Sequence, residues 1–247
     1  MSSLLLESDL FTTWFGRALR EDRFETWFQP IVDTSGVTNR AGHPRVLGYD
    51  CSLRTFDGRL HSDEEILKPA RLREDPASHS HACEVVIQAV AAQPHNGPWF
   101  INFAPSLIRV QEIRIQEFCR MGMLPRDIVF TAAESDLASD PDRSFDIRDF
   151  MRNCGFGFAV DGVGSHADSL RTVCDLQPDY IKLDKSLVRS IERPVHAATI
   201  RKVVEIGDGT HARVIAKGVD RTRTMENLWL LGVRYMQGYL FGSPKSP

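Results

Sequence analysis

Polar and charged side chains follow or close short apolar runs throughout this chain of 247 residues. Their types are an arginine, two lysines, amides, carboxylates and a hydroxyl. They are Arg54, Asn102, Thr131 with Glu134, Asp161, Lys182 with Asp184, Lys217 with Asp220, and Gln237. Such groups are unfavourable in a packed interior unless they meet water, one another or a ligand. Singly, each can face solvent at a strand end; as a set, they favour an anionic, hydrogen-bonding ligand such as a phosphate or a nucleotide.

Short apolar runs alternate with helical patterns and would position these side chains. The runs predict strands at Phe24–Val32, Arg45–Arg54, Trp99–Asn102, Asp127–Ala133, Gly157–Val160, Tyr180–Leu183, Arg213–Ala216 and Tyr235–Gly238. Helical spacing predicts helices at His81–Ala92, Ser106–Met121, Asp142–Cys154, Ser165–Leu176, Val195–Ile206 and Thr222–Leu231. Ser165 is expected to cap one helix, and Gly207 to stand just past the end of another.

This alternation predicts an α/β fold, a TIM-like (β/α)8 barrel, in which a mainly parallel sheet is wrapped by helices. The turn at 34–44 is too short for a helix, so we expect one antiparallel strand near the N-terminus. The carboxyl ends of barrel strands build the active site in such folds, which would gather the polar residues on one face. We expect one barrel domain at 21–247 and an N-terminal helix at 1–20 packed on it, or presented to a partner.

Composition excludes several functional classes. The chain has 30 Lys and Arg against 33 Asp and Glu, so no basic excess indicates a nucleic-acid partner. No apolar run reaches the roughly 18 residues of a membrane span, and the N-terminus does not resemble a signal peptide. The odd number of cysteines lacks a CxxC pair and predicts reduced thiols in a cytoplasmic protein, at Cys51, Cys83, Cys119, Cys154 and Cys174.

Seven short segments form an ordered series of motifs. They are Phe28–Asp33 (FQPIVD), Gly48–Arg54 (GYDCSLR), Ile101–Ser106 (INFAPS), Asp161–Ser165 (DGVGS), Asp179–Asp184 (DYIKLD), Val214–Asp220 (VIAKGVD) and Gln237–Gly242 (QGYLFG). Over nearly its whole length the chain thereby resembles the EAL-domain family of cyclic di-GMP phosphodiesterases. The resemblance implies a TIM-like barrel with an antiparallel strand. It also implies hydrolysis of one phosphodiester bond with Mg²⁺ or Mn²⁺, which are held mainly by carboxylates in active relatives.

Several catalytic positions that the resemblance implies are altered here. The family's metal-binding glutamate falls at Asp50, and its asparagine ligand is kept as Asn102. A glutamate ligand falls at Thr131, which is neutral. Of two paired aspartates the first is kept as Asp161, and the second falls at Gly162. The resemblance therefore implies a damaged metal site.

Two lysines complete this comparison of positions. The lysine that helps to position the attacking water is kept as Lys182, whereas the family's general-base glutamate falls at Lys217. An ammonium ~4 Å from a dication opposes its binding by several kcal/mol at an effective dielectric constant near 20. A protonated ammonium also cannot accept a proton from water. We therefore expect no intact catalytic set and no bound metal or other cofactor.

The positions that the resemblance assigns to ligand binding are better kept. They are Gln29, Leu53, Arg54, Asn102, Asp161, Lys182, Asp184, Lys217, Asp220 and Gln237. Arg54 is the expected phosphate clamp, and Lys217 can replace a metal as counter-charge. The main hypothesis is a degenerate EAL domain that binds cyclic di-GMP as a receptor and signals through a regulatory protein partner.

Two alternatives stay open. In the first, the domain has lost the ligand too and acts only through protein contacts. The loop at 162–166 supports it, because the loop is rich in glycine and Glu134, which braces it in the family, follows Ala133 instead of threonine. In the second, Asp50, Asn102 and Asp161 retain weak phosphodiesterase activity. A homodimer is compatible with either.

Histidines offer a weaker signal. His166 beside the glycine-rich loop, and the pair His79 and His81, can be interpreted as metal ligands. A surface histidine and a solvated helix start are the simpler interpretations.

Overall fold

The structure, a computed structural model, describes most of the barrel. The described residues are 23–36, 44–56, 60–61, 76–94, 97–103, 105, 123–166 and 169–246. The helices expected at 1–20 and at Ser106–Met121 lie outside them.

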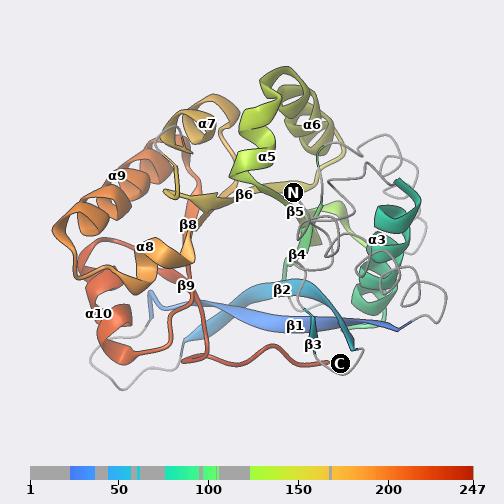
Figure 1. The fold of residues 1–247 in the computed structure, drawn as a ribbon, viewed down its shortest axis with the longest axis horizontal. Helices are drawn as coiled ribbons and strands as arrows, with labels where there is room; N and C mark the ends of the chain where they lie inside the picture. Colours follow the sequence, from blue (N-terminus) through green and yellow to red (C-terminus); the bar gives the residue numbers. More distant parts are fainter. Residues whose placement is uncertain are drawn as a thin grey trace, which may run out of the picture.

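One sheet closes into a barrel (Figure 1). Its strands are β1 (Phe24–Asp33), β2 (Arg45–Phe56), β3 (Leu60–His61), β4 (Trp99–Asn102), β5 (Ile128–Ala133), β6 (Gly157–Val163), β7 (Tyr180–Leu183), β8 (Arg213–Lys217) and β9 (Tyr235–Gln237). Their order is β1-β9-β8-β7-β6-β5-β4-β2-β3, and pairing of β1 with β2 closes the ring. Within the ring, β1 is antiparallel to both of its neighbours, and all the other pairs are parallel. The predicted TIM-like barrel with an antiparallel first strand is confirmed.

Helices surround the parallel part of the barrel (Figure 1). They are α3 (Pro76–Ala91), α5 (Glu134–Ser139), α6 (Pro141–Asn153), α7 (Ser169–Leu176), α8 (Lys185–Arg189), α9 (Pro194–Thr210) and α10 (Thr222–Leu230), with a 3-10 turn η2 (Pro125–Asp127). The short α5, α8 and β3 were not predicted from the sequence. Beside β1, the C-terminal segment pairs through the backbone of Phe28 and Lys245.

One predicted helix boundary is wrong, and another is not tested. Helix α9 continues past Gly207 and is capped by His211, whose φ is 62°. Gly207 instead allows close packing, because a Cβ there would lie 2.8 Å from Cγ2 of Val214. Ser165 lies before α7, and its hydroxyl donates to the carbonyl of Gly162 at 2.8 Å. Residues 167–168, between it and α7, lie outside the described part, so the cap expected at Ser165 stays a prediction.

The interior of the barrel contains two layers of different character. The apolar layer consists of buried residues from five strands, namely Ile31, Phe100, Val129, Ala159 and Ile215. Because side chains alternate along a strand, the residue two positions away also points inward. These neighbours, toward the carboxyl ends of the parallel strands, form the polar layer of Gln29, Asn102, Thr131, Asp161 and Lys217. The other core fills the space between the sheet and the helices.

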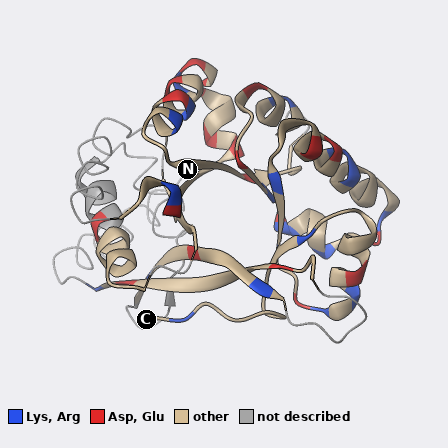
Figure 2. Cartoon of the chain, turned by 180° about the vertical axis from the view of Figure 1, so that it is seen from behind, with Lys and Arg blue, Asp and Glu red and all other residues tan. Residues whose placement is uncertain are grey.

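Charges of both signs are interspersed along the outer helices, as Figure 2 shows from behind. In the described part of the chain, no helix has both the length and the hydropathy that a membrane crossing requires.

Candidate functional site

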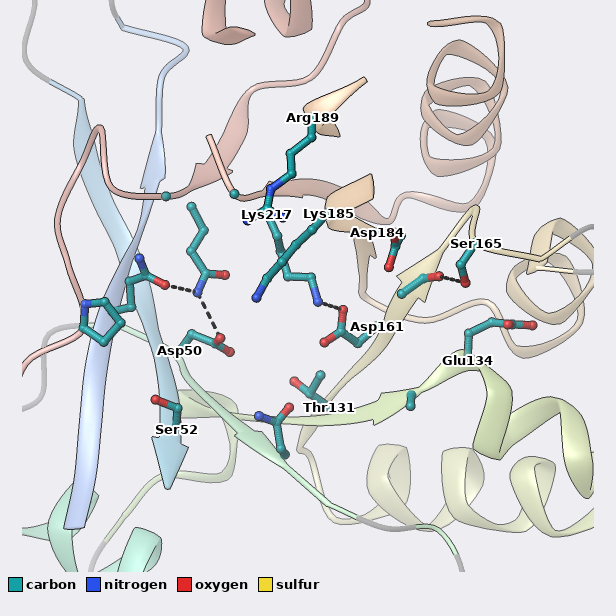
Figure 3. A pocket seen from close by; sticks show the side chains of 18 of the residues that line it. Asp50, Ser52, Thr131, Glu134, Asp161, Ser165, Asp184, Lys185, Arg189 and Lys217 are labelled. Carbon is teal, nitrogen blue, oxygen red and sulfur yellow. Dashed lines mark hydrogen bonds and ion pairs between the residues drawn. The ribbon is translucent and has the colours of Figure 1, made fainter. Parts of the chain in front are cut away.

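A pocket of about 800 Å³ opens at the carboxyl ends of the strands (Figure 3). It collects the polar layer and the loops beyond it. Of the predicted site residues, those that line it are Gln29, Asp50, Arg54, Asn102, Thr131, Asp161, Gly162, Asp184, Lys217, Asp220 and Gln237. These residues therefore lie together at the end of the barrel where such folds place their sites.

Two predicted ligand-binding residues do not line the pocket. Leu53 alternates with Ser52 and Arg54 along β2, so its side chain points to the opposite face and lies in the core, 2% exposed. Lys182 is completely buried and contacts the pocket lining through Asp50.

A series of hydrogen-bonded side chains links strands β7, β2, β9 and β1 inside the barrel. The ammonium of Lys182 donates to Oδ1 of Asp50 at 2.5 Å. Gln237 Nε2 donates to Oδ2 of Asp50 at 3.0 Å and to Oε1 of Gln29 at 2.8 Å. Gln29 in turn donates to the carbonyl of Gly242 at 2.9 Å. Both carboxylate oxygens of Asp50 are therefore engaged by protein donors.

A second ion pair joins β8 to β6. Nζ of Lys217 contacts Oδ1 of Asp161 (Figure 3). Burial alone raises the pKa of Asp161, but the charges of Lys217 and Lys182 outweigh it and hold the pKa below its ordinary value. Burial likewise lowers the pKa of Lys182, and the charges of Asp50 and Asp161 outweigh it and raise the pKa above its ordinary value. The neighbouring opposite charges thus favour the charged forms of Asp161 and Lys182.

Two polar atoms of the site are buried without a partner among the described residues. The hydroxyl of Thr131, a residue that is 1% exposed, has no hydrogen bond. Oε1 of Gln237 also lacks a donor, although Nε2 of the same amide makes two bonds. Buried polar atoms in native proteins are generally satisfied by protein, water or ligand. Both residues line the pocket, so a ligand there has a donor and an acceptor to meet.

Two further pocket carboxylates hold backbone segments. Asp184 begins α8, and its Oδ1 accepts from the backbone N–H of Ser186 at 2.8 Å. Asp220 accepts from the backbone N–H of Tyr239 at 3.1 Å and so fixes the segment after β9. Their positions shape the edge of the pocket.

The glycine-rich loop after β6 is held by a buried glutamate. Oε1 of Glu134, a residue that is 3% exposed, accepts from the Thr172 hydroxyl at 3.0 Å. Oε2 lies 3.5 Å from Nδ1 of His166, which is also 2.9 Å from the Ser165 hydroxyl. We expected this loop to be less braced; in the structure, Glu134 reaches it through His166.

The histidines that offered a weak metal-binding signal are His166, His79 and His81. Among the residues that the structure describes, no group of three or more His, Cys, Asp or Glu is arranged to hold a metal ion. The side chains of His79 and His81 lie outside the described part. No disulfide joins the cysteines within that part, which are Cys51, Cys154 and Cys174.

Sequence reasoning missed some pocket residues. Lys185 and Arg189 extend from α8 over the pocket (Figure 3), and Tyr239 also lines it. The available signal was the capping aspartate Asp184 followed by two cations at a spacing of four residues.

Comparison with known proteins decides the family. The family model described as "EAL domain" matches residues 13–244. The chain belongs to the EAL-domain family. PdeA of Escherichia coli K12, a probable cyclic di-GMP phosphodiesterase, is 27% identical over 85% of this chain and 30% of its own length. RocR of Pseudomonas aeruginosa, a cyclic di-GMP phosphodiesterase, is 31% identical over 49% of this chain and 31% of its own. This EAL domain thus spans less than a third of either relative.

Solved EAL structures share the fold. The FimX EAL domain of Pseudomonas aeruginosa, bound to c-di-GMP, has a TM-score of 0.80 at 18% identity, over 95% of this chain and 96% of that one. The Xanthomonas citri FimX EAL domain, in complex with c-di-GMP, has a TM-score of 0.82 at 14% identity, over 100% and 98%. At these low sequence identities, the similarity to the two solved structures concerns the barrel fold alone.

Proposed function

We propose that this EAL domain binds cyclic di-GMP without hydrolysing it, and that it acts as a receptor that signals through a protein partner. The family relation and the c-di-GMP bound to the FimX neighbours support the choice of ligand. The main support for the proposed loss of hydrolysis is the ion pair between Lys217 and Asp161.

A pair of divalent cations does not fit the polar layer. Metal binding needs carboxylates with free negative charge, but Asp161 is neutralised by Lys217 and Asp50 by Lys182. A cation entering between them would also meet two ammonium groups, each repelling it by several kcal/mol at roughly 4 Å and an effective dielectric constant near 20. The hydroxyl of Thr131 and the backbone at Gly162 bring no compensating charge.

The remaining pocket suits a nucleotide. Its volume of about 800 Å³ falls in the range of small-molecule sites, roughly 300–1,000 Å³. The unpartnered hydroxyl of Thr131 can donate to a phosphate oxygen, and Oε1 of Gln237 can accept from a base or ribose donor. Arg54 offers a guanidinium for a phosphate.

The wider setting belongs to the same proposal. We assign the barrel to 21–247 and place the domain in the cytoplasm. A regulatory protein is its proposed partner, and a homodimer is an alternative assembly. Since the chain spans under a third of the relatives named above, this assignment concerns the domain.

Calorimetry tests the proposal directly. Cyclic di-GMP is titrated into the chain in buffer with EDTA, and saturable heat is expected at micromolar ligand. Arg54→Gln is expected to weaken binding about tenfold or more, since it removes a charge-assisted contact. Arg201→Gln, which removes an exposed charge on α9, is the matched control and should bind as wild type does.

The other outcomes separate the alternatives. No heat at high micromolar ligand overturns the receptor proposal and favours a regulator that acts only through protein contacts. Formation of the linear dinucleotide with added Mn²⁺ overturns it in favour of weak phosphodiesterase activity.

A further inference from the structure

We propose that Lys185 and Arg189, the α8 pair, form the subsite that receives a phosphodiester group of the bound ligand. This inference rests on the proposed function and specifies which charges replace the metals. It concerns residues outside the motif positions considered above.

The α8 pair stands on a firmly held element. Asp184 caps the helix, and Leu187 and Val188 bury its other face. Gly164, with φ of 94°, permits this approach, because a Cβ there would lie 2.2 Å from Cδ1 of Leu187. Helix α8 is therefore fixed against the loop after β6.

The pair faces the pocket from one side of the helix. Residues four apart share a helix face, and both members line the pocket. Figure 3 shows the Lys185 and Arg189 side chains reaching toward its middle. A Cβ at Gly218 would lie 3.6 Å from Cγ of Lys185, so the lysine stem runs beside the residue that follows Lys217.

The α8 pair differs from Lys182 and Lys217 in its ion-pair partners. Lys182 is bound to the carboxylate of Asp50, and Lys217 to that of Asp161. Among the residues that the structure describes, neither the Lys185 ammonium nor the Arg189 guanidinium has a hydrogen bond or an ion pair. A bound anion would give the α8 pair its partner without breaking either ion pair.

Of the acidic residues that line the same pocket, Asp50 and Asp161 are paired with Lys182 and Lys217, and three others accept hydrogen bonds. Asp184 and Asp220 accept from backbone N–H groups, and Glu134 accepts from Thr172. A phosphodiester carries one negative charge over two oxygens, which matches a planar guanidinium beside an ammonium. The α8 pair is exposed, so its attraction for an anion weakens as salt screens it.

The test compares charge removal at two places. In EDTA and low salt, cyclic di-GMP is titrated into wild type, K185Q/R189Q, and R201Q/K202Q, which removes two exposed charges from α9. We expect K185Q/R189Q to bind about tenfold or more weakly and with less dependence on salt. R201Q/K202Q and the charge-conserving K185R/R189K should stay close to wild type. Wild-type affinity in K185Q/R189Q overturns the subsite and leaves the proposed function standing.

A second probe keeps the two proposals separable. If wild type does not bind cyclic di-GMP, the proposed function fails, and inorganic pyrophosphate then tests the subsite by NMR. Amide signals of residues 185–189 that move in wild type and stay still in K185Q/R189Q support an anion subsite at α8. Signals that do not move in wild type overturn it.

Discussion

The apolar and polar layers of the barrel occupy the same interior and come from the same strands, yet their side chains are opposite in character. On β8, for example, the fully buried Ile215 is followed two positions later by Lys217, which pairs with Asp161. The apolar layer excludes water and contributes packing, whereas the polar layer is held by ion pairs and amide contacts. The difference indicates that one end of the barrel holds the fold and the other retains chemical groups for a ligand.

The largest effect is expected at the ion pair between Lys182, the most buried charged residue of the site, and Asp50. Lys182→Met leaves the partly buried Asp50 without its cation and should lower the unfolding free energy by about 3–5 kcal/mol. The double variant Lys182→Met/Asp50→Asn should recover most of that loss, because it removes the unpaired charge. Denaturant unfolding measures both. A double variant as unstable as the single one would contradict the ion-pair account.

A deletion in the apolar layer should affect stability alone. Ile215→Ala removes fully buried methyl groups and should lower the unfolding free energy by about 2–5 kcal/mol, and Ile215→Val by about 1 kcal/mol. Below the unfolding transition, calorimetry with cyclic di-GMP should give wild-type affinity for both. An Ile215→Val variant with normal stability and weakened binding would erase the distinction between the layers.

The Lys217–Asp161 pair predicts a dependence on pH. Because the folded pKa of Asp161 lies below its ordinary value, the carboxylate stabilises the fold above about pH 4, and this stabilisation is lost as the pH falls through the lowered pKa. Protonation begins to reduce the stability of wild type as the pH falls below about 5. Over that acid range, thermal unfolding should show a smaller loss of stability for Asp161→Asn than for wild type. Asp208→Asn, at an exposed position on α9, should follow wild type. Parallel curves for wild type and Asp161→Asn would refute the assignment.

The smallest effect is expected at Thr131. Thr131→Val removes a buried hydroxyl that has no protein partner, so stability should stay equal or rise by about 1 kcal/mol, while cyclic di-GMP affinity falls. Thr34→Val is the contrasting variant, since its hydroxyl donates to the Arg234 carbonyl at 2.7 Å and accepts from Trp229. It should lose about 1–3 kcal/mol. Equal losses at the two positions would show that the Thr131 hydroxyl is satisfied within the fold.

The barrel could be predicted from the sequence because its strands are short apolar runs that alternate with helical patterns. The same alternation also predicted that polar residues gather at the carboxyl ends of the barrel strands. Helix α8 was missed because five residues show no helical period, and with it Lys185 and Arg189 were missed. Leu53 lies in the core, outside the pocket lining, and a motif match alone does not fix which face of β2 a side chain takes.

The pairing within the polar layer could not be predicted in the same way. Lys217 and Asp161 are 56 residues apart, and their contact depends on how β8 and β6 are staggered on either side of β7. From the sequence, Lys217 is a free counter-charge for a ligand. In the structure Lys217 is bound to Asp161, so the cations of α8 are the better candidates for binding an anion.

Turnover of cyclic di-GMP is the most direct measurement of the central claim. The purified chain is incubated with the dinucleotide and excess Mn²⁺, and the linear product is quantified beside an Asp50→Asn/Asp161→Asn variant. The account predicts no linear product from either protein, with the ligand bound equally well in Mn²⁺ and in EDTA. Linear product from wild type that disappears in the double variant would contradict it.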